Sequence, residues 1–548
     1  MTSSPAAITS SKAQPAPVTD QPPLLAAAIL AAAVLLLFLT APRQEDFWWT
    51  DAPTIALNGE LARDYITAGF PHTPLAFANA WFLRYPALSI SLYPPLFPMA
   101  EAAMFAVFGF SHPVAQATVA AFTALAAYGA YLTARTALPP LAAAGFTLLL
   151  FATPGMMLWS RQVMMEIPSL AFLLIGTAVL LRYQAAGGSW RLLLATAMVL
   201  AGVYTKQTAI FATAAFGIAL LLGEGPSLLR RPAVWLAILV GVLGLLPLIA
   251  FTLTFASQAI DIALRQGTAA TAGDTSHLSF VAFANYARAL PVIVGWLPLA
   301  GALGYLIFVI FRGWRDIAEK RLAMLMLAWF AADYMFVSLV GHFEERYGMT
   351  LAIPPAMLSV LLITRITQER LGSITALAGG AALFAFSLAT DPVHWVSGYG
   401  AVATAILDHT TQDDVILCNL NDTKSLVFSL RSRSPKPKVY VLRAEKLMLN
   451  YSIVRDWGID DRNFSTADIE AMIDRDGISL VALQPDFWTD QPSIARLQAL
   501  VYSDRFEQVA ELSIAAQDRH QRTTIKIFRN KNPTQPTKQT LRELERQQ

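Results

Sequence analysis

Runs of apolar residues, each long enough to cross a membrane, recur along most of this chain. A helix of roughly 20 apolar residues spans the hydrocarbon core of a bilayer. The sequence predicts eleven such spans, near residues 22–42, 112–134, 140–156, 166–182, 190–205, 207–222, 232–256, 290–311, 322–340, 350–364 and 372–390. The pattern therefore predicts a polytopic α-helical membrane protein. The amphipathic segment 93–111 is shorter, and we expect it to lie in the membrane interface.

Beyond residue 390 the pattern changes to short β-rich runs separated by helical segments. The runs "DVILCNL", "KVYVL", "ISLVALQP" and "TTIKIF" alternate with "STADIEAMIDRDG" and "SIARLQALVY". Such alternation is typical of an α/β domain. We therefore predict a transmembrane domain over 22–390 with a first outer loop at 43–111, then an α/β domain over 391–530. Residues 1–21 and 531–548 are predicted to be polar tails, the first of them disordered.

Composition agrees with this class and excludes others. Of 548 residues, 55% are hydrophobic and 14% are charged, whereas a soluble globular protein is about 25% charged. The net charge of +2 is not concentrated in a basic patch, so nucleic acid is not an expected partner. Cys418 is the only cysteine, which excludes an intramolecular disulfide and a cysteine-based metal cluster.

The distribution of basic residues predicts the orientation. With a cytoplasmic N-terminus, the five inner loops hold 11 Lys/Arg in 41 residues, and the outer segments hold 8 in 116. Cytoplasmic loops are usually the richer in Lys and Arg. Eleven spans then place the C-terminal domain outside, in the periplasm of a bacterium, and make the chain a multi-pass inner-membrane protein.

This topology brings four distant ionisable residues to the outer membrane ends: Asp51, Glu166, Lys206 and Arg346. Ionisable residues at membrane depth are costly and mark functional sites. Each also has a structural interpretation. Glu166 can favour a helix N-terminus, Lys206 can extend to lipid headgroups, and Arg346 can neutralise a neighbouring glutamate.

Several stretches resemble the GT-C superfamily of polyprenyl-phosphate-sugar-dependent glycosyltransferases, in the branch of aminoarabinose transferases and protein O-mannosyltransferases. They are "WWTDAPTIALNGELARDYITAG", "YPPLFPMAEAAMFAVFG", "LFATPGMMLWSRQVMMEIPSLAFLL", "YTKQTAIFA" and "ERYGMTLAIPPAML". The resemblance implies a catalytic carboxylate in the first outer loop, at Asp51 or alternatively Asp46. It also implies a second acid at Glu166.

Two departures from this family pattern bear on the substrate and on a metal. Ala52 follows the first-loop acid, where many relatives carry a second acid. The sequence "LYPPL" has Leu92 and Tyr93 where aminoarabinose transferases have an acid and a lysine. These departures count against aminoarabinose as the sugar. They also count against a bound divalent metal ion, although such an ion is kept as a possible cofactor.

The reaction implied by the resemblance is attack by an acceptor hydroxyl on the anomeric carbon of a lipid-phosphate-linked sugar, with inversion. Asp51 is the expected base, and Lys206, Arg346 and Arg161 are expected to neutralise the donor phosphate. Flat aromatic faces for a sugar ring or a prenyl chain are expected from Trp48, Trp49, Trp81 and Tyr93. The Trp48–Trp49 pair can equally be an interfacial anchor.

The acceptor is left open between lipid A, core oligosaccharide, another lipid and protein. Two other classes of function compete with the transferase. An ion-coupled secondary transporter would use Asp51 and Glu166 to bind protons or cations, but such sites usually lie near the middle of the membrane. A membrane-anchored receptor would not need eleven spans.

Overall fold

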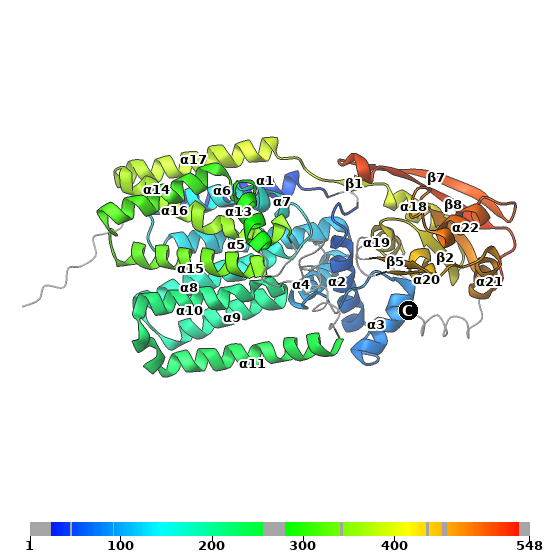
Figure 1. Ribbon diagram of the computed structural model, residues 1–548, viewed down its shortest axis with the longest axis horizontal. Helices are drawn as coiled ribbons and strands as arrows, with labels where there is room; N and C mark the ends of the chain where they lie inside the picture. Colours follow the sequence, from blue (N-terminus) through cyan, green and yellow to red (C-terminus); the bar gives the residue numbers. More distant parts are fainter. Residues whose placement is uncertain are drawn as a thin grey trace, which may run out of the picture.

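The computed structural model describes residues 23–43, 46–90, 92–255, 280–339, 343–434, 438–451 and 458–535. A helical bundle occupies one end of the molecule and a sheet-containing domain the other (Figure 1). The predicted tail 1–21, and residues 536–548 of the predicted C-terminal tail, lie outside the described residues.

The bundle contains a helix at each of the eleven predicted spans. Its helices are α1 (Pro23–Thr40), α5 (His112–Ala134), α6 (Pro140–Phe151), α7 (Pro154–Trp159), α8 (Glu166–Ala186), α9 (Ser189–Thr205), α10 (Phe211–Glu224), α11 (Pro232–Phe255), α13 (Phe280–Val294), α14 (Trp296–Arg312), α15 (Ile317–Leu339), α16 (Ile353–Ile366) and α17 (Glu369–Thr390), with 3-10 turns η1 (Gln207–Ile210), η2 (Pro226–Arg230) and η3 (Glu345–Ala352). Within the described residues, eight helical segments are long and apolar enough to cross a membrane, and the bent α13–α14 pair, taken as one span, makes a ninth. Helices α6 and α9 are shorter, at 12 and 17 residues. The predicted multi-pass helical architecture is confirmed.

Proline and glycine set the boundaries of several of these helices. A proline stands at the first or second position of α5, α6, α7 and α16, where its missing N–H is not needed. Gly295 separates α13 from α14 with φ +90°, a conformation that L side chains rarely adopt. The two helices meet there at 106°, so the predicted span 290–311 is a bent pair rather than one straight helix.

Small residues let α6 and α17 approach closely. A Cβ atom added at Gly145 would lie 2.4 Å from the backbone of Ala376, and one added at Gly380 would lie 2.3 Å from the carbonyl oxygen of Gly145. Close contacts of this kind between small residues are a common way for helices to associate in membranes. They fix α17, and with it the point where the chain leaves the bundle for the C-terminal domain.

Three helices between α1 and α5 lie at the junction between the bundle and the C-terminal domain (Figure 1). They are α2 (Ala52–Thr67), α3 (Pro74–Arg84) and α4 (Leu96–Phe108). Helix α2 packs on α4 through Gly59, where an added Cβ would lie 2.8 Å from Glu101 Cβ. Met99, Val107 and Phe108 of α4 are exposed, which suits the interfacial position predicted for 93–111.

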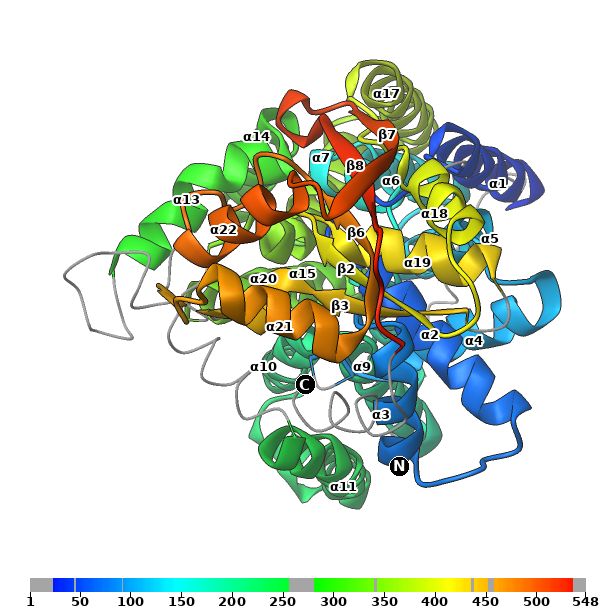
Figure 2. The ribbon, with the colours of Figure 1, turned by 90° about the vertical axis from the view of Figure 1, so that its right-hand side faces the viewer.

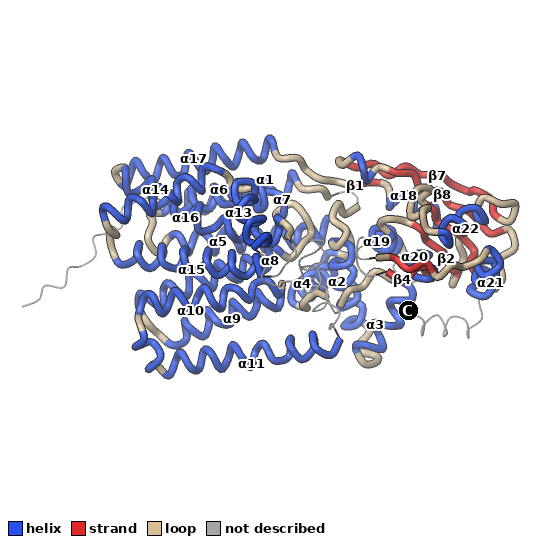
Figure 3. The backbone as a smooth tube through the Cα atoms, viewed as in Figure 1, coloured by secondary structure: helices blue, strands red, loops and turns tan. Residues whose placement is uncertain are grey.

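The C-terminal domain has a six-stranded mixed sheet in the order β1-β7-β8-β6-β2-β3. Its elements are β1 (Val396–Ser397), α18 (Tyr399–Asp408), β2 (Asp414–Asn419), α19 (Thr423–Arg433), β3 (Val439–Arg443), α20 (Ala444–Met448), β4 (Leu449–Tyr451), β5 (Ile459–Asp461), α21 (Thr466–Asp476), β6 (Ile478–Leu483), α22 (Pro492–Val501), β7 (Phe506–Ala516), η5 (Arg519–Gln521) and β8 (Thr523–Asn530). Strands β3, β2 and β6 are parallel, and β8, β7 and β1 join antiparallel. Figures 2 and 3 show the strands gathered at this end of the molecule.

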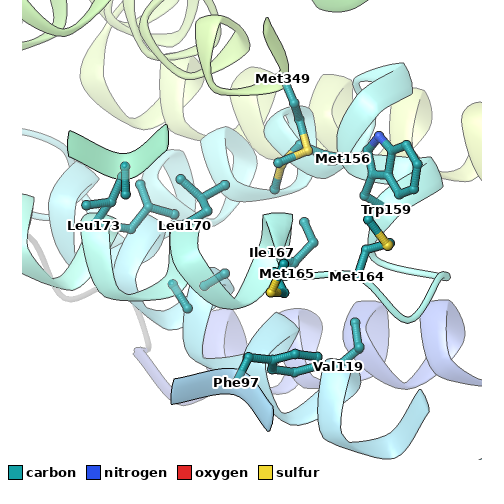
Figure 4. Close-up of a cluster of buried hydrophobic side chains, with 14 of the residues drawn as sticks. Phe97, Val119, Met156, Trp159, Met164, Met165, Ile167, Leu170, Leu173 and Met349 are labelled. Carbon is teal, nitrogen blue, oxygen red and sulfur yellow. The ribbon is translucent and has the colours of Figure 1, made fainter. Parts of the chain in front are cut away.

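The start of α8 is held in a dense apolar core. Met164, Met165 and Ile167 are buried and lie between Met156 and Met349 on one side and Phe97 and Val119 on the other (Figure 4). Glu166 lies within this apolar sequence. Because its neighbours are fixed by packing, the position of its carboxylate is also fixed.

Candidate active site

Asp51 stands at the N-terminus of α2 and is the N-cap residue of that helix. Its side chain makes no capping hydrogen bond, so the carboxylate is available for other contacts. The indole Nε1 of Trp49 donates to Asp51 Oδ2 at 3.3 Å. The N-terminus of α2 also carries a partial positive charge, which attracts acidic side chains. The local structure thus holds a carboxylate oxygen at the mouth of the bundle.

The four residues predicted to share the outer face lie in one cluster. Lys206, in the turn between α9 and η1, donates from Nζ to Glu166 Oε1 at 2.6 Å. Arg346 of η3 places Nη1 at 3.5 Å from Asp51 Oδ2 and 3.9 Å from Glu166 Oε1. A single guanidinium therefore joins the two carboxylates that the sequence singled out.

Aromatic rings surround the cations of this cluster. The guanidinium carbon of Arg346 lies 4.9 Å from the ring centre of Trp49 and 5.1 Å from that of Tyr347. Lys206 Nζ lies 5.0 Å from the ring centre of Tyr347. Burial, and then the Asp51 charge, raise the pKa of Tyr93 well above its ordinary value. Its phenol therefore stays protonated beside Asp51.

The charges of the cluster are strongly coupled. Burial lowers the pKa of Lys206, and the Glu166 carboxylate acts in the opposite direction. The other oxygen of that carboxylate, Oε2, is buried and has no hydrogen-bond partner among the described residues. A buried oxygen without a partner is costly, so the site has spare capacity to accept a hydrogen bond from a ligand.

Three further charged residues belong to the site and were not among the predicted site residues. Lys424 Nζ, from α19 of the C-terminal domain, lies 3.8 Å from Asp51 Oδ1. Glu344 pairs with Arg346 Nε. Asp333 of α15 accepts from Thr350 Oγ1 at 2.5 Å. Asp333 is an isolated acid inside an apolar span, which is a usable sequence signal, whereas nothing local marks Lys424.

A pocket connects this cluster to the interior of the bundle. It is lined by charged, polar and apolar residues: Glu166, Ser169, Leu170, Leu173, Lys206, Thr208, Ala209, Phe211, Asp333, Val337, Arg346, Tyr347, Met349 and Thr350. Cationic and apolar side chains in one pocket suit an amphipathic ligand with an anionic group.

The alternative acid, Asp46, lies apart from these charges. Its Oδ2 accepts from the backbone N–H of Tyr399 at 2.8 Å, and its Oδ1 accepts from Ser429 Oγ at 3.1 Å. Trp48 stacks on His394 at 4.2 Å between ring centres and donates to Asp518 at 2.6 Å. The structure therefore uses Asp46 and Trp48 to join the first loop to the C-terminal domain.

A second group of contacts joins α2 to the C-terminal domain. Arg431 of α19 reaches Glu60 Oε1 at 2.7 Å and Asp64 Oδ2 at 2.8 Å. Trp81, predicted to stack on a sugar or lipid, donates to Asp64 at 3.0 Å. Trp81 therefore lies among structural contacts. In the same group, burial raises the pKa of Glu60 to about 7.

Arg161, predicted as a third phosphate ligand, is buried in the turn before α8. Its Nε donates to the carbonyl of Met157 at 2.9 Å, and its Nη1 has no hydrogen-bond partner among the described residues. Burial lowers its pKa, and the charge of Asp391 acts against that shift. These contacts involve none of the four clustered residues.

The residues present do not fit a divalent metal ion. No group of three or more His, Cys, Asp or Glu side chains suited to a metal occurs in the part of the chain that the structure describes. Asp51 and Glu166 both face Arg346 Nη1 within 3.9 Å, so a positive charge already lies between them. The site as built supplies its own cations.

Comparisons with known proteins find a family match for part of the sequence and solved structures with a similar fold. Residues 93–251 match the family described as dolichyl-phosphate-mannose-protein mannosyltransferase. No curated protein matches the chain.

Among solved structures, ArnT from Cupriavidus metallidurans bound to undecaprenyl phosphate is similar with a TM-score of 0.59 at 15% identity, over 94% of this chain and 100% of that one. The same protein in the apo state has a TM-score of 0.53 at 15% identity, over 91% of this chain and 97% of that one. The apo oligosaccharyltransferase of Archaeoglobus fulgidus has a TM-score of 0.50 at 12% identity, over 84% of this chain and 69% of that one. The family match thus covers residues 93–251, and the solved structures share the fold of this chain.

Proposed function

We propose that this protein transfers a sugar from a polyprenyl-phosphate donor to an acceptor hydroxyl, with inversion at the anomeric carbon. The observation that carries the proposal is the Asp51 carboxylate beside the Arg346 guanidinium, 3.5 Å away, with Lys206 close by on Glu166. The family match and the similarity to a structure that holds undecaprenyl phosphate support the same donor class. They favour a transferase over the ion-coupled transporter.

Asp51 acts as the base in the proposed reaction. The acceptor oxygen forms a bond to the anomeric carbon while the bond from that carbon to the phosphate oxygen breaks, and the hydroxyl proton passes to Asp51. A carboxylate must lie on the face of the sugar opposite the leaving group for this to happen. Trp49 holds Asp51 Oδ2 by a hydrogen bond. Asp51 Oδ1 points toward the C-terminal domain, where it lies near Lys424 Nζ.

Arg346 and Lys206 stabilise the leaving group. The donor phosphodiester carries one negative charge, and the departing polyprenyl phosphate carries more as the bond breaks. Fixed cations aimed at developing charge stabilise a transition state more than the ground state. In the structure both cations are paired with carboxylates. A bound phosphate competes for them and releases Glu166 to accept hydrogen bonds from sugar hydroxyls.

The aromatic side chains divide between binding and assembly. Trp49 and Tyr347 line the cations and offer faces on which a sugar ring can lie. The phenol of Tyr93 stays protonated and donates a hydrogen bond to the Asp51 carboxylate. Trp48 and Trp81 make their hydrogen bonds to Asp518 and Asp64, so their role is to hold the first loop in place.

The C-terminal domain completes the site in this proposal. Lys424 approaches Asp51 from α19, and the same helix holds Asp46 through Ser429. The acceptor enters between this domain and the mouth of the bundle. Lipid A, core oligosaccharide, another lipid and protein all carry hydroxyls that fit the reaction.

Donor dependence is the direct test of this function. The purified full-length protein would be offered labelled polyprenyl-phosphate sugars with a crude outer-membrane lipid extract, and nucleotide sugars would serve as the matched control. We expect label to move from one lipid-linked donor, with no requirement for an ion gradient. The proposal fails if no lipid-linked donor transfers label while the protein is folded. Because the side chain of Cys418 is fully buried, its protection from a thiol dye reports the folded state.

The proposed orientation, with the site and the C-terminal domain in the periplasm and the N-terminus in the cytoplasm, predicts a labelling pattern. Ser227 and Gln508 are exposed and would be replaced by cysteine one at a time. In intact cells with a permeable outer membrane, an impermeant maleimide should label the 508 variant and not the 227 variant. Native Cys418 is buried and provides the background. Labelling at 227 from outside would overturn the orientation.

A further inference from the structure

A second pocket opens at the other end of helix α8, where α5 ends and α15 begins. It is lined by Leu132, Arg135, Thr136, Leu181, Arg182, Ala185, Ala318 and Arg321. Arg182 lies 16 residues after Glu166 on the same helix, so about 24 Å of helix separates the pocket from the candidate active site. The two pockets are therefore distinct.

The lining of this pocket is basic and contains no acidic residue. Arg135, Arg182 and Arg321 come from three different chain segments and converge on one cavity. None of them forms an ion pair with a carboxylate among the described residues, and the polar contact of Arg135 is a donation to the carbonyl of Leu138 at 2.5 Å. Three guanidinium groups without a counterion repel one another unless an anion lies between them.

Other arginines at this end of the bundle do form ion pairs with carboxylates. Arg315 contacts Asp316 at 2.9 Å, and Arg365 contacts buried Glu319 at 3.1 Å. The acids of this region are thus directed to other arginines. The pocket arginines are left to face the cavity and the solvent, with Arg182 exposed and Arg135 and Arg321 half-buried.

The remaining walls indicate what kind of anion fits. Leu132, Leu181, Ala185 and Ala318 give the cavity apolar sides, and all lie within a few residues of the ends of helices that cross the membrane. Guanidinium groups bind phosphate oxygens through paired hydrogen bonds. Basic pockets between transmembrane helices are recognised sites for anionic lipid headgroups. The pocket is open to solvent, and its space of about 520 Å³, open solvent included, leaves room for a phosphate group.

We propose that Arg135, Arg182 and Arg321 form a binding site for the phosphate group of an anionic lipid, at the end of the bundle remote from the sugar-transfer site. The phosphate lies among the three guanidinium groups, and the acyl chains run along the apolar wall toward the membrane. Free inorganic phosphate shares this chemistry but leaves the apolar wall uncovered. The site is independent of the reaction at Asp51.

The test uses the full-length protein in detergent and a matched pair of variants. Arg182→Gln with Arg321→Gln removes two pocket charges. Arg312→Gln with Arg370→Gln removes two exposed charges from loops that the sequence assigns to the same membrane side. Binding of phosphatidylglycerol, cardiolipin, phosphatidylcholine and inorganic phosphate would be measured by native mass spectrometry and by competition.

We expect the pocket variant to lose roughly thirtyfold in affinity for the anionic phospholipids, and the control variant to lose less than threefold. Phosphatidylcholine should bind equally weakly to all three proteins. Competition by millimolar inorganic phosphate would assign the site to the phosphate group itself, and its absence would assign it to the whole lipid. Equal losses in the two variants, or none in the pocket variant, would overturn the proposal. Arg182→Lys, at an exposed position, tests the same site with minimal risk to folding.

Discussion

Asp51→Asn is expected to lower kcat for sugar transfer by about two to four orders of magnitude, the usual contribution of a general base. The substitution keeps the shape of the side chain and an oxygen that can accept from Trp49 Nε1. It removes the negative charge that takes the proton of the acceptor hydroxyl. The donor KM should change little, because the phosphate contacts reside on Arg346 and Lys206. Steady-state kinetics with the donor identified in the panel would measure both constants.

Asp46→Asn is the matched control for that experiment. Asp46 is an aspartate of the same loop, but it accepts hydrogen bonds from Tyr399 N–H and Ser429 at the C-terminal domain. We expect a lower midpoint of thermal unfolding and nearly normal kcat in the folded fraction. The reverse result, with normal turnover for Asp51→Asn and none for Asp46→Asn, would transfer the role of the base to Asp46.

Arg346→Ala should be the second most damaging change, with a loss of about 10²–10³ in kcat, as for removal of a group that stabilises developing charge. Its guanidinium contacts Asp51, Glu166 and Glu344 together. Its removal takes away the cation nearest the leaving phosphate and also leaves those carboxylates to repel one another. The readout is the rate of polyprenyl phosphate release in single-turnover experiments.

Arg346→Lys separates the charge from the geometry. A lysine keeps the positive charge but not the planar fork that reaches two partners, so we expect partial recovery of kcat. Lys206→Ala should mainly raise the donor KM, because Glu166 is the one carboxylate in the described part of the chain with which Lys206 forms an ion pair. If Arg346→Ala leaves both kcat and the donor KM unchanged, Arg346 merely neutralises Glu344.

The sequence allowed the helical architecture to be predicted, and also the proximity of four of the candidate site residues, because both depend on strong local signals. Apolar runs of membrane length are constrained by the bilayer, and each predicted run contains a helix in the structure. Alternation of the spans then brought Glu166, Lys206 and Arg346 to one end of the bundle. Their contacts of 2.6–3.9 Å are compatible with that topology.

Other features depend on tertiary contacts that no local pattern carries. In the sequence, the whole membrane domain lies between Asp51 and Lys424, although their side chains are neighbours in the structure. The polar segment "NDTKSL" suggests an exposed lysine and does not indicate this contact. Asp46 and Asp51 look alike in sequence, and only the position of the C-terminal domain distinguishes them. Strand β7 was not predicted because polar residues such as Glu507, Gln508 and Glu511 interrupt its apolar pattern.

The contact between Trp48 and Asp518 spans 470 residues and has a consequence for biosynthesis. Ribosomes add about 5–20 residues per second, so roughly half a minute to a minute and a half separates the synthesis of the two partners. Throughout that time the loop bearing Asp51 has no C-terminal domain to hold it. A nascent or truncated chain therefore lacks the contacts that complete the candidate site, and we expect activity only when translation and folding of the last strands are complete.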